Sequence, residues 1–422
     1  MIDLKLICLG DHAKVISGYA FKSKDFVDYG VPAIKIGNIN IGNVSFESAS
    51  TQYLSQHFIS HIDEKFHVGK GDILLSLTGS HMTQPNSVVG RVARYDHGFI
   101  SLLNQRSGKI ISIDYTVFDK SFLYYLMSTK AIRQEIALLA HGAANQANVS
   151  PKDIEKLKLN IPSVSIQKKI AAVLSAYDDL IENNKRRIAL LEKMAEEIYR
   201  EWFVRFRFPG YQKAEFEKGI PKKWVIGSLG DIAEMLMGQS PKSEFYNNQR
   251  EGLPFHQGVG SYGDRFPVND TYCSVDGRIA NEGSILFSVR APVGRLNIAN
   301  TKMIIGRGLA GISHKDDCNS YLYYLLKVAF ANEDIIGNGA IFNSVGKNEL
   351  SGFKIFIPHS NLVEDFEKRI SPIDDQIKLL LQAQDNLLKT KNNLLPRLIS
   401  GKLSVEELDI QFPPSMLDED VA

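Results

Sequence analysis

Two segments of the chain place apolar residues at alternating intervals of four and three, which predicts one buried face on each of two long helices. The first segment, from about Ser165 to Phe206, carries the series Tyr177, Ile181, Asn184, Ile188, Leu191, Ala195, Ile198 and Trp202. The second repeats that register 196 residues later, as Ile373, Ile377, Leu380, Gln384, Leu387, Lys391, Leu394 and Leu398. Two unrelated amphipathic helices would explain the apolar faces but not the shared register. The pattern therefore favours an intramolecular coiled coil.

The ends of these helices are marked less clearly than their faces. Ser165 is a candidate N-cap, and Pro209-Gly210 is a stop signal. Pro372 and Pro396 predict a break or kink near each end of the second helix. A helix of about 40 residues would span roughly 60 Å, which is longer than a compact domain needs, so the pair is expected to act as a spacer.

Short motifs outside the helices recur in the same order, which indicates an internal repeat. Leu9–Asp11 returns as Leu229–Asp231, and Leu123–Leu126 returns as Leu322–Leu325. Further pairs are Gly18 with Gly238, Asp72–Ser76 with Ser284–Ser288, Gly90–Val92 with Gly294–Leu296, and Ile161-Pro162 with Ile357-Pro358. Each copy begins with short β-rich runs separated by Gly, Pro and Asn, as in Ala33–Ile36 and Lys109–Ile113, and continues with a helical pattern, as at Phe122–Leu139.

These patterns predict an α+β protein with two tandem mixed α/β domains and two long antiparallel helices that form a coiled coil, related by a pseudo-twofold axis. The helices should be antiparallel because the chain must leave one domain and return to it. The expected parts are a first domain at 1–162, a spacer helix at 163–208, a second domain at 209–360, a second spacer helix at 361–403 and a loose acidic tail at 404–422. Residues 208–228, where the second domain begins, have a linker composition.

Composition narrows the class of protein. Apolar residues make up 44% and charged residues 23%, as in a protein that buries real cores. The three cysteines have no metal or disulfide spacing, which is typical of a reducing cytoplasm. We expect neither a signal peptide nor a membrane span, because the apolar runs are short and interrupted by charge.

The formal net charge is only +1, so any nucleic-acid contact must come from local patches. Residues 283–313 contain four Lys or Arg and no acidic residue, and the matching stretch 73–113 contains four against one Asp. Both stretches are rich in Gly, Ser, Asn and Gln, which suits reading of duplex DNA. A solvated basic surface is the alternative for one patch, and its repetition weakens that alternative. The candidate DNA-binding residues are Lys35, Gln105, Arg106, Asn145, Gln146, Arg290, Arg307, Asn338 and Asn343.

No catalytic motif with the right context is present in the sequence. Gly258–Gly263 satisfies G-x-G-x-x-G, but an apolar strand is not expected before it and Pro267 blocks a following helix. His57 and His61 are spaced as metal ligands could be, yet no Glu follows His57 as in a zinc protease. We therefore expect no catalytic residue, no metal and no cofactor in this chain. The alternatives from other classes are a fused methyltransferase or nuclease and a coiled-coil scaffold without DNA readout.

Taken together, these features resemble the specificity subunits of type I restriction-modification enzymes. The resemblance covers nearly the whole chain. It rests on both Leu-Gly-Asp openings and on Asn148–Pro162, Gln167–Leu174, Gly219–Trp224 and Leu395–Leu403.

The resemblance implies that each domain reads one half of a split double-stranded DNA site and that the helices set the gap. It also implies two modification subunits that carry S-adenosylmethionine and methylate adenine, with restriction subunits, which translocate and cut DNA, joining through them. The apolar residues beside the seam exceed what a two-stranded coil buries, so they are candidate partner contacts. They are Leu180, Met194, Tyr199, Phe203, Leu381 and Leu388.

Overall fold

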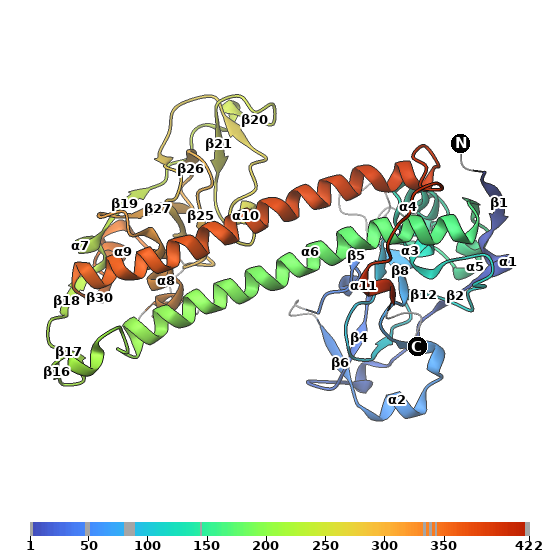
Figure 1. Ribbon diagram of the computed structural model, residues 1–422, viewed down its shortest axis with the longest axis horizontal. Helices are drawn as coiled ribbons and strands as arrows, with labels where there is room; N and C mark the ends of the chain where they lie inside the picture. The colour runs from blue at the N-terminus through green and yellow to red at the C-terminus, as the bar shows by residue number, and fades with distance from the viewer. Residues whose placement is uncertain are drawn as a thin grey trace. The chain divides into compact units, whose positions relative to one another are not determined.

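The computed structural model describes residues 3–46, 51–79, 89–143, 146–331, 335–336, 340–341 and 344–417, as Figure 1 shows. Contacts group the chain into two compact units. The first unit consists of Met1–Asn184 and Ala383–Ala422, and the second of Lys185–Gln382. Each unit therefore contains one half of each long helix.

The first unit is built around two five-stranded sheets. One has the order β2 (Lys14–Ser17), β12 (Ser107–Ile111), β8 (Ile73–Ser76), β10 (Val92–Arg94) and β5 (Gly42–Asn43). The other has the order β3 (Phe26–Val27), β6 (Gln52–Leu54), β4 (Val31–Ile34), β11 (Ser101–Leu103) and β7 (His67–Val68). A further pair joins β1 (Lys5–Cys8) to β15 (Lys158–Ile161), and β13 (His141–Ala143) and β14 (Gln146–Asn148) pair beside β9 (Thr78–Gly79). The helices are α1 (Leu9–His12), α2 (His57–His61), α3 (Lys120–Ser128), α4 (Lys130–Leu138) and α5 (Pro151–Glu155).

The second unit repeats this strand order, except that its first sheet has no counterpart of β5 among the described residues. One sheet runs β19 (Ala233–Met237), β27 (Leu309–His314), β24 (Ile285–Ser288) and β25 (Leu296–Ile298). The other runs β20 (Tyr246–Asn247), β22 (Tyr272–Cys273), β21 (Leu253–His256), β26 (Met303–Ile305) and β23 (Ile279–Ala280). Again β18 (Val225–Ser228) pairs with β30 (Lys354–Ile357), and the helices are α7 (Leu229–Ile232), α8 (Asn319–Ala329) and α9 (Lys347–Ser351). The predicted repeat of mixed α/β domains is confirmed.

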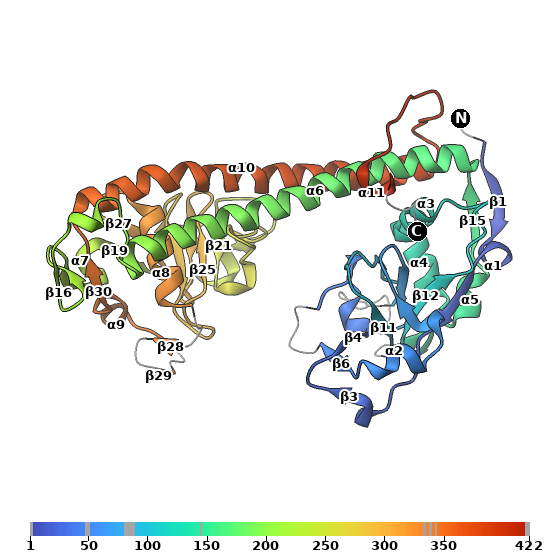
Figure 2. The ribbon, with the colours of Figure 1, turned by 60° about the horizontal axis from the view of Figure 1, so that its bottom comes forward.

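The two long helices are α6 (Val164–Tyr199), which ends in a π-helical turn at Arg200–Val204, and α10 (Ser360–Ile399). In the first unit Ile170 and Leu174 of α6 share a core with Leu398 near the end of α10. In the second unit the ring centroid of Tyr199, at the end of α6, lies 5.9 Å from that of Phe366, near the start of α10. The helices are therefore antiparallel in each unit, and they lie side by side in Figures 1 and 2.

The predicted seam is confirmed residue by residue. Every apolar or polar seam position named from the sequence is buried or half-buried, whereas Leu190 and Leu379, which are off the seam, are 67% and 64% exposed. The polar seam residue Lys391 donates to Asp178 of α6 and lies 5.4 Å from the ring centroid of Tyr125. A partly buried ion pair of this kind joins one level of α10 to one level of α6 and so favours this helix register.

Several local predictions were wrong. Ser165 is not the N-cap, because α6 begins one residue earlier. The break predicted at Pro372 and Pro396 is absent, because α10 is helical throughout Ser360–Ile399. The predicted helix at Phe122–Leu139 is two helices, because the extended backbone of Thr129 ends α3 and its side chain caps α4. Gly258–Gly263 does follow a strand, β21, but only the three-residue 3-10 helix Val259–Ser261 comes next.

The segment with a linker composition and the tail that was expected to be loose both make specific contacts. In residues 208–228, β16 (Phe216–Glu217) pairs with β17 (Ile220–Pro221), and Phe208 stacks on Trp224 at 6.0 Å between ring centroids. After Val405, the chain supplies backbone acceptors to Lys169 and reaches α11 (Pro414–Leu417). Among the described residues, no helix combines the length and apolar character that a membrane span requires.

Candidate nucleic-acid interface

In the first unit, a tight turn between β11 and β12 presents Gln105 and Arg106 to solvent. Its backbone is held on both sides. The Asn104 amide donates to the Ile34 carbonyl at 3.1 Å, and the Arg106 carbonyl accepts from the Leu77 amide at 3.1 Å. These bonds join the two sheets at the turn, so the exposed side chains project from a fixed frame.

The turn between β26 and β27 of the second unit has the same frame. The Gly306 amide donates to the His256 carbonyl at 2.8 Å, and the Gly308 carbonyl accepts from the Val289 amide at 2.9 Å. Arg307 is exposed at its tip, and its amide donates to the Ser240 hydroxyl at 3.2 Å. The candidates Gln105, Arg106 and Arg307 therefore lie in equivalent turns of the two units.

Gly18 and Gly238 explain why these turns can lie so close to the end of β2 in the first unit and of β19 in the second. A Cβ on Gly18 would lie 2.4 Å from the carbonyl oxygens of Leu103 and Asn104, and one on Gly238 would lie 2.2 Å from the Gly306 oxygen. Real Cβ atoms do not make such contacts, so only glycine fits without moving the turn. The recurrence of this glycine in the sequence thus reflects a packing constraint of the site.

The remaining DNA-binding candidates fall into two groups. Arg290 is exposed, and its backbone forms an antiparallel β-bridge with that of Ser344. Thr78 and Asn148 are paired in the same way in the first unit. Lys35 follows β4, donates to Gln52 and lies 4.9 Å from the ring centroid of Phe26. Asn145, Asn338 and Asn343 lie outside the described residues, and Gln146 is described only as part of the backbone of β14.

Sequence reasoning missed Gln257, which is exposed and occupies in the second unit the position of Lys35 in the first. Its side-chain oxygen accepts from Ser240 at 2.8 Å, beside the Arg307 turn. Strand register makes the two residues equivalent, because Ile34 pairs with Leu103 as His256 pairs with Ile305, and Lys35 and Gln257 are the next residues. That register becomes visible only when the strands are in place.

The candidate partner contacts also divide. Leu180, Met194 and Leu388 are 50%, 47% and 46% exposed, and Leu381 is half-buried. The premise for Tyr199 and Phe203 was wrong, because both are buried, at 6% and 7% exposure, in the core of the second unit. The ring centroid of Tyr321 lies 4.9 Å from that of Phe203 and 6.0 Å from that of Tyr199, so the recognition domain itself covers both side chains. Leu190 and Leu379 are additional exposed apolar residues on the helices.

A Tyr–Asp contact fastens each recognition domain to the helix pair. In the first unit the Tyr125 hydroxyl donates to Asp178 at 2.7 Å, and in the second the Tyr324 hydroxyl donates to Asp374 at 3.1 Å. The two tyrosines come from the repeated Leu-Tyr-Tyr-Leu motif. A cation completes each contact, but it is Lys391 from α10 in the first unit and Arg265 from a loop in the second.

Arg265 is the more deeply buried of these cations, at 1% exposure. It lies 2.5 Å from Asp374, 3.3 Å from Glu192 and 4.6 Å from the ring centroid of Tyr323. Burial alone would lower the pKa of Arg265, but Asp374 and the tyrosines raise it, so the side chain stays charged. Burial also raises the pKa of Tyr323 to about 12 despite the nearby Arg265.

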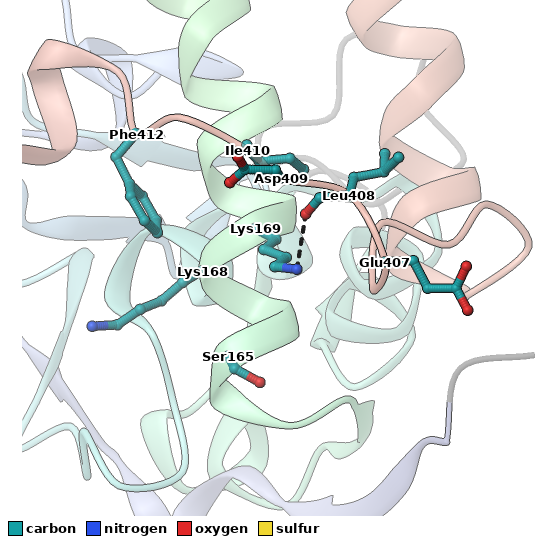
Figure 3. Close-up of a pocket in the computed structure, with 8 residues that line it drawn as sticks. All are labelled: Ser165, Lys168, Lys169, Glu407, Leu408, Asp409, Ile410 and Phe412. Atoms are coloured by element: carbon teal, nitrogen blue, oxygen red, sulfur yellow. Dashed lines mark hydrogen bonds between the residues drawn. The ribbon is translucent and has the colours of Figure 1, made fainter.

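A pocket of about 520 Å³ lies between the first turns of α6 and the segment after Val405, as Figure 3 shows. Lys169 donates to the carbonyl oxygens of Glu406 and Leu408 at 2.6 and 2.9 Å. These bonds hold the tail against the helix. In the part of the chain that the structure describes, no group of three or more His, Cys, Asp or Glu residues could hold a metal ion.

Comparison with known proteins identifies the family. The type I restriction modification DNA specificity domain matches residues 1–193 and 221–394. A specificity subunit assigned to the MjaX type I restriction enzyme of Methanocaldococcus jannaschii is 31% identical over 81% of this chain and 80% of its own length. The MjaIX specificity subunit of the same organism is 27% identical over 77% of this chain and 79% of its own.

The fold agrees with a solved structure of low sequence identity. The crystal structure of the type I restriction-modification S subunit from M. genitalium is 16% identical and has a TM-score of 0.58, with 94% of this chain and 96% of that chain covered. The match of the specificity domain to both copies and the identity to a relative over four-fifths of the chain agree with the duplicated architecture. The chain belongs to the type I restriction-modification DNA specificity family, as a specificity subunit and not an enzyme.

Proposed function

We propose that this chain reads a double-stranded DNA target in two parts, one part with each unit, and directs modification and restriction subunits to that target. The observation that carries the proposal is the duplicated turn. Both units present exposed polar or cationic side chains, Gln105 and Arg106 in one and Arg307 in the other, from the same hydrogen-bonded frame. Arg and Gln are side chains that recognise base edges in the major groove.

Two readers on one chain also make sense energetically. One good bidentate base contact contributes about 1–3 kcal/mol of discrimination, so a single small domain selects few positions. Linking two domains makes the second binding event intramolecular. Since α6 and α10 each run through both units without a break, we propose that they set the gap between the two half-sites.

The exposed apolar residues of the helices are the proposed contacts for two modification subunits. Leu180, Leu190, Leu379 and Leu388 are between 46% and 67% exposed, and a partner that covered them would remove this apolar surface from water. In this proposal S-adenosylmethionine is bound by the modification subunits, this chain holds no cofactor, and the restriction subunits join through the modification subunits. The cytoplasm, where the DNA lies, is the proposed compartment.

The test is methylome sequencing of a host that produces this chain with its modification subunits, compared with a host that produces the modification subunits alone. We expect adenine methylation at one motif with two specified parts and an unspecified gap of fixed length. An uninterrupted motif, or methylation that does not depend on this chain, would contradict the proposal. DNA methylation or cleavage by the purified chain alone would favour the enzyme alternative, and assembly without any DNA preference would favour the scaffold.

Alanine variants then test the contacts. Arg106→Ala, Arg290→Ala and Arg307→Ala should each weaken site-specific binding by about 1–3 kcal/mol if the arginine reads a base. Each should relax one position of the motif. An unchanged motif and unchanged affinity for all three variants would remove these residues from the interface.

A further inference from the structure

The turns at the β11–β12 and β26–β27 junctions can be aligned residue by residue from strand register. In the first unit β4 pairs Ile34 with Leu103, and in the second unit β21 pairs His256 with Ile305. On the other side of the turn, Gly108 pairs with Leu75 as Ala310 pairs with Phe287. Both registers place Gln105 and Arg307 at the same position of the turn.

The backbone around this position is the same in both units. The amide of Gly18 donates to the Ser107 carbonyl at 3.0 Å, and that of Gly238 donates to the Leu309 carbonyl at 2.9 Å. The following residue donates to the carbonyl of Leu103 at 2.8 Å in one unit and of Ile305 at 3.0 Å in the other. With the two bonds per turn described above, four equivalent contacts fix the frame while the side chain it presents differs.

Neither side chain is engaged within the described part of the chain. Gln105 and Arg307 are both exposed, and their side chains have no hydrogen-bond or ion-pair partner among the described residues. Arg307 contributes a positive charge near Tyr246 and so opposes the rise in the pKa of that hydroxyl that its burial causes. Arg106, the next residue in the first unit, has the side-chain-free Gly308 as its counterpart.

Selective recognition of a base requires a side chain that is held in a fixed position, and the same turn backbone holds Gln105 in one unit and Arg307 in the other. Gln places a donor and an acceptor where they match N7 and N6 of adenine, and Arg places two donors where they match N7 and O6 of guanine. We propose that this turn reads a base in each half-site, with Gln105 selecting adenine in one and Arg307 selecting guanine in the other. This inference rests on the proposed function and assigns a base to one position in each half-site.

The test exchanges the two side chains in the complex assembled with its modification subunits. Arg307→Gln should change one guanine of one half-site to adenine, and Gln105→Arg should change one adenine of the other half-site to guanine. Discrimination at the changed position should shift by about tenfold to a hundredfold. The readouts are the methylated motif in genomic DNA and selection of bound duplexes from a library randomised at both half-sites.

The matched control is Arg187→Gln, which removes the same charge from an exposed position on α6 and should leave the motif unchanged. Arg307→Ala is a second variant, and it should relax the same single position that Arg307→Gln alters. If Arg307→Gln and Arg307→Ala lower binding uniformly and keep the parental preference, Arg307 contacts phosphate and the inference is overturned. The two-part motif of the unaltered chain would then still support the proposed function, whereas absence of that motif would refute the function itself.

If a variant assembles but no longer methylates, the duplex library decides. A shifted base preference in the selected duplexes supports the inference, and the parental preference overturns it.

Discussion

Replacing Arg265 tests whether the recognition domain of the second unit is fixed to the helices by charge. The guanidinium is 1% exposed and lies between Asp374 and Glu192, whose side chains are 18% and 27% exposed. Arg265→Met fills much of the same space without a charge. It leaves two carboxylates that share one partly buried site, with the Tyr324 hydroxyl as a donor to Asp374.

The magnitude follows from the degree of burial. Removing one partner of a fully buried ion pair costs about 3–5 kcal/mol, because the remaining charge is desolvated and unpaired. Water reaches both carboxylates here, so the lower end of that range is appropriate for the pairs. Loss of the cation–π contact with Tyr323 adds about 1 kcal/mol. We therefore expect Arg265→Met to destabilise the contact by roughly 3–4 kcal/mol, which is a factor of a hundred or more in its opening equilibrium.

Hydrogen exchange followed by mass spectrometry measures this opening in the intact chain, which avoids treating a two-unit protein as a two-state system. Peptides that cover residues 262–270 and 319–329 should exchange about a hundredfold faster, while peptides from the first unit serve as an internal control. Arg265→Met combined with Asp374→Met should recover part of the loss, because one buried carboxylate is removed. Lys391→Met should have a smaller effect on the first unit, because Lys391 is 13% exposed and, among the described residues, forms an ion pair with Asp178 alone.

Exchange in Arg265→Met within fivefold of the parent chain would refute the reasoning. It would mean that apolar packing alone holds the domain on the helices. A double variant that exchanges faster than Arg265→Met would contradict the role assigned to the unpaired carboxylates.

Three further predictions concern the helices and the second unit. Deleting one heptad from each helix, Ile181–Arg187 and Leu381–Leu387, keeps the seam in phase, avoids both Tyr–Asp contacts and shortens the helices by about 10 Å. The methylated motif should keep both halves but lose about three base pairs of gap, or methylation should stop because the half-sites are rotated. An unchanged gap would show that the helices do not set the distance between the half-sites. Burial lowers the pKa of His256 below 6.5, so the folded state binds a proton at this side chain less readily than the unfolded state. Stability is therefore full above pH 6.5 and falls as the pH drops below it. His256→Gln should weaken this pH dependence in urea unfolding of the second unit. Leu180→Ser and Leu388→Ser should reduce assembly with the modification subunits and reduce aggregation of the free chain in light scattering, and equal assembly by the variants and the parent would remove these leucines from the docking surface.

The long-range architecture could be predicted because it depends on periodic signals. A heptad register repeated after 196 residues and a set of motifs in constant order require no knowledge of contacts. Every predicted seam position is buried or half-buried, and the described parts of both copies share their strand order apart from β5. Element ends were less accurate. The α3–α4 boundary depends on one extended residue, Thr129, and α10 is helical through Pro372 and Pro396 although each proline lacks the amide that a helix hydrogen bond needs.

Exposure on the helices could be predicted only in part. The sequence identifies apolar residues beside the seam, but it does not show which of them a distant segment covers. Tyr199 and Phe203 are buried because Tyr321, more than a hundred residues later, packs on both. Leu388, which directly follows a seam residue as Tyr199 and Phe203 do, remains exposed, and so does Leu180.

The two Tyr–Asp contacts show most clearly where prediction from the repeat stops. Asp178 and Asp374 are 196 residues apart, as are the seam positions, and Tyr125 and Tyr324 belong to a repeated motif, so this half of the contact is visible in the sequence. The cation is not. The seam position that corresponds to Lys391 in the first helix is Ala195, which is fully buried and carries no charge.

The second unit therefore needs a cation from elsewhere, and Arg265 supplies it from a loop of the recognition domain. An unpaired carboxylate in this position would be costly, so the two aspartates require a compensating charge. Nothing requires that charge to come from the same element, because any segment that reaches the site can supply it. The duplicated sequence thus predicts that a charge must be present at each contact, and the fold determines which residue carries it.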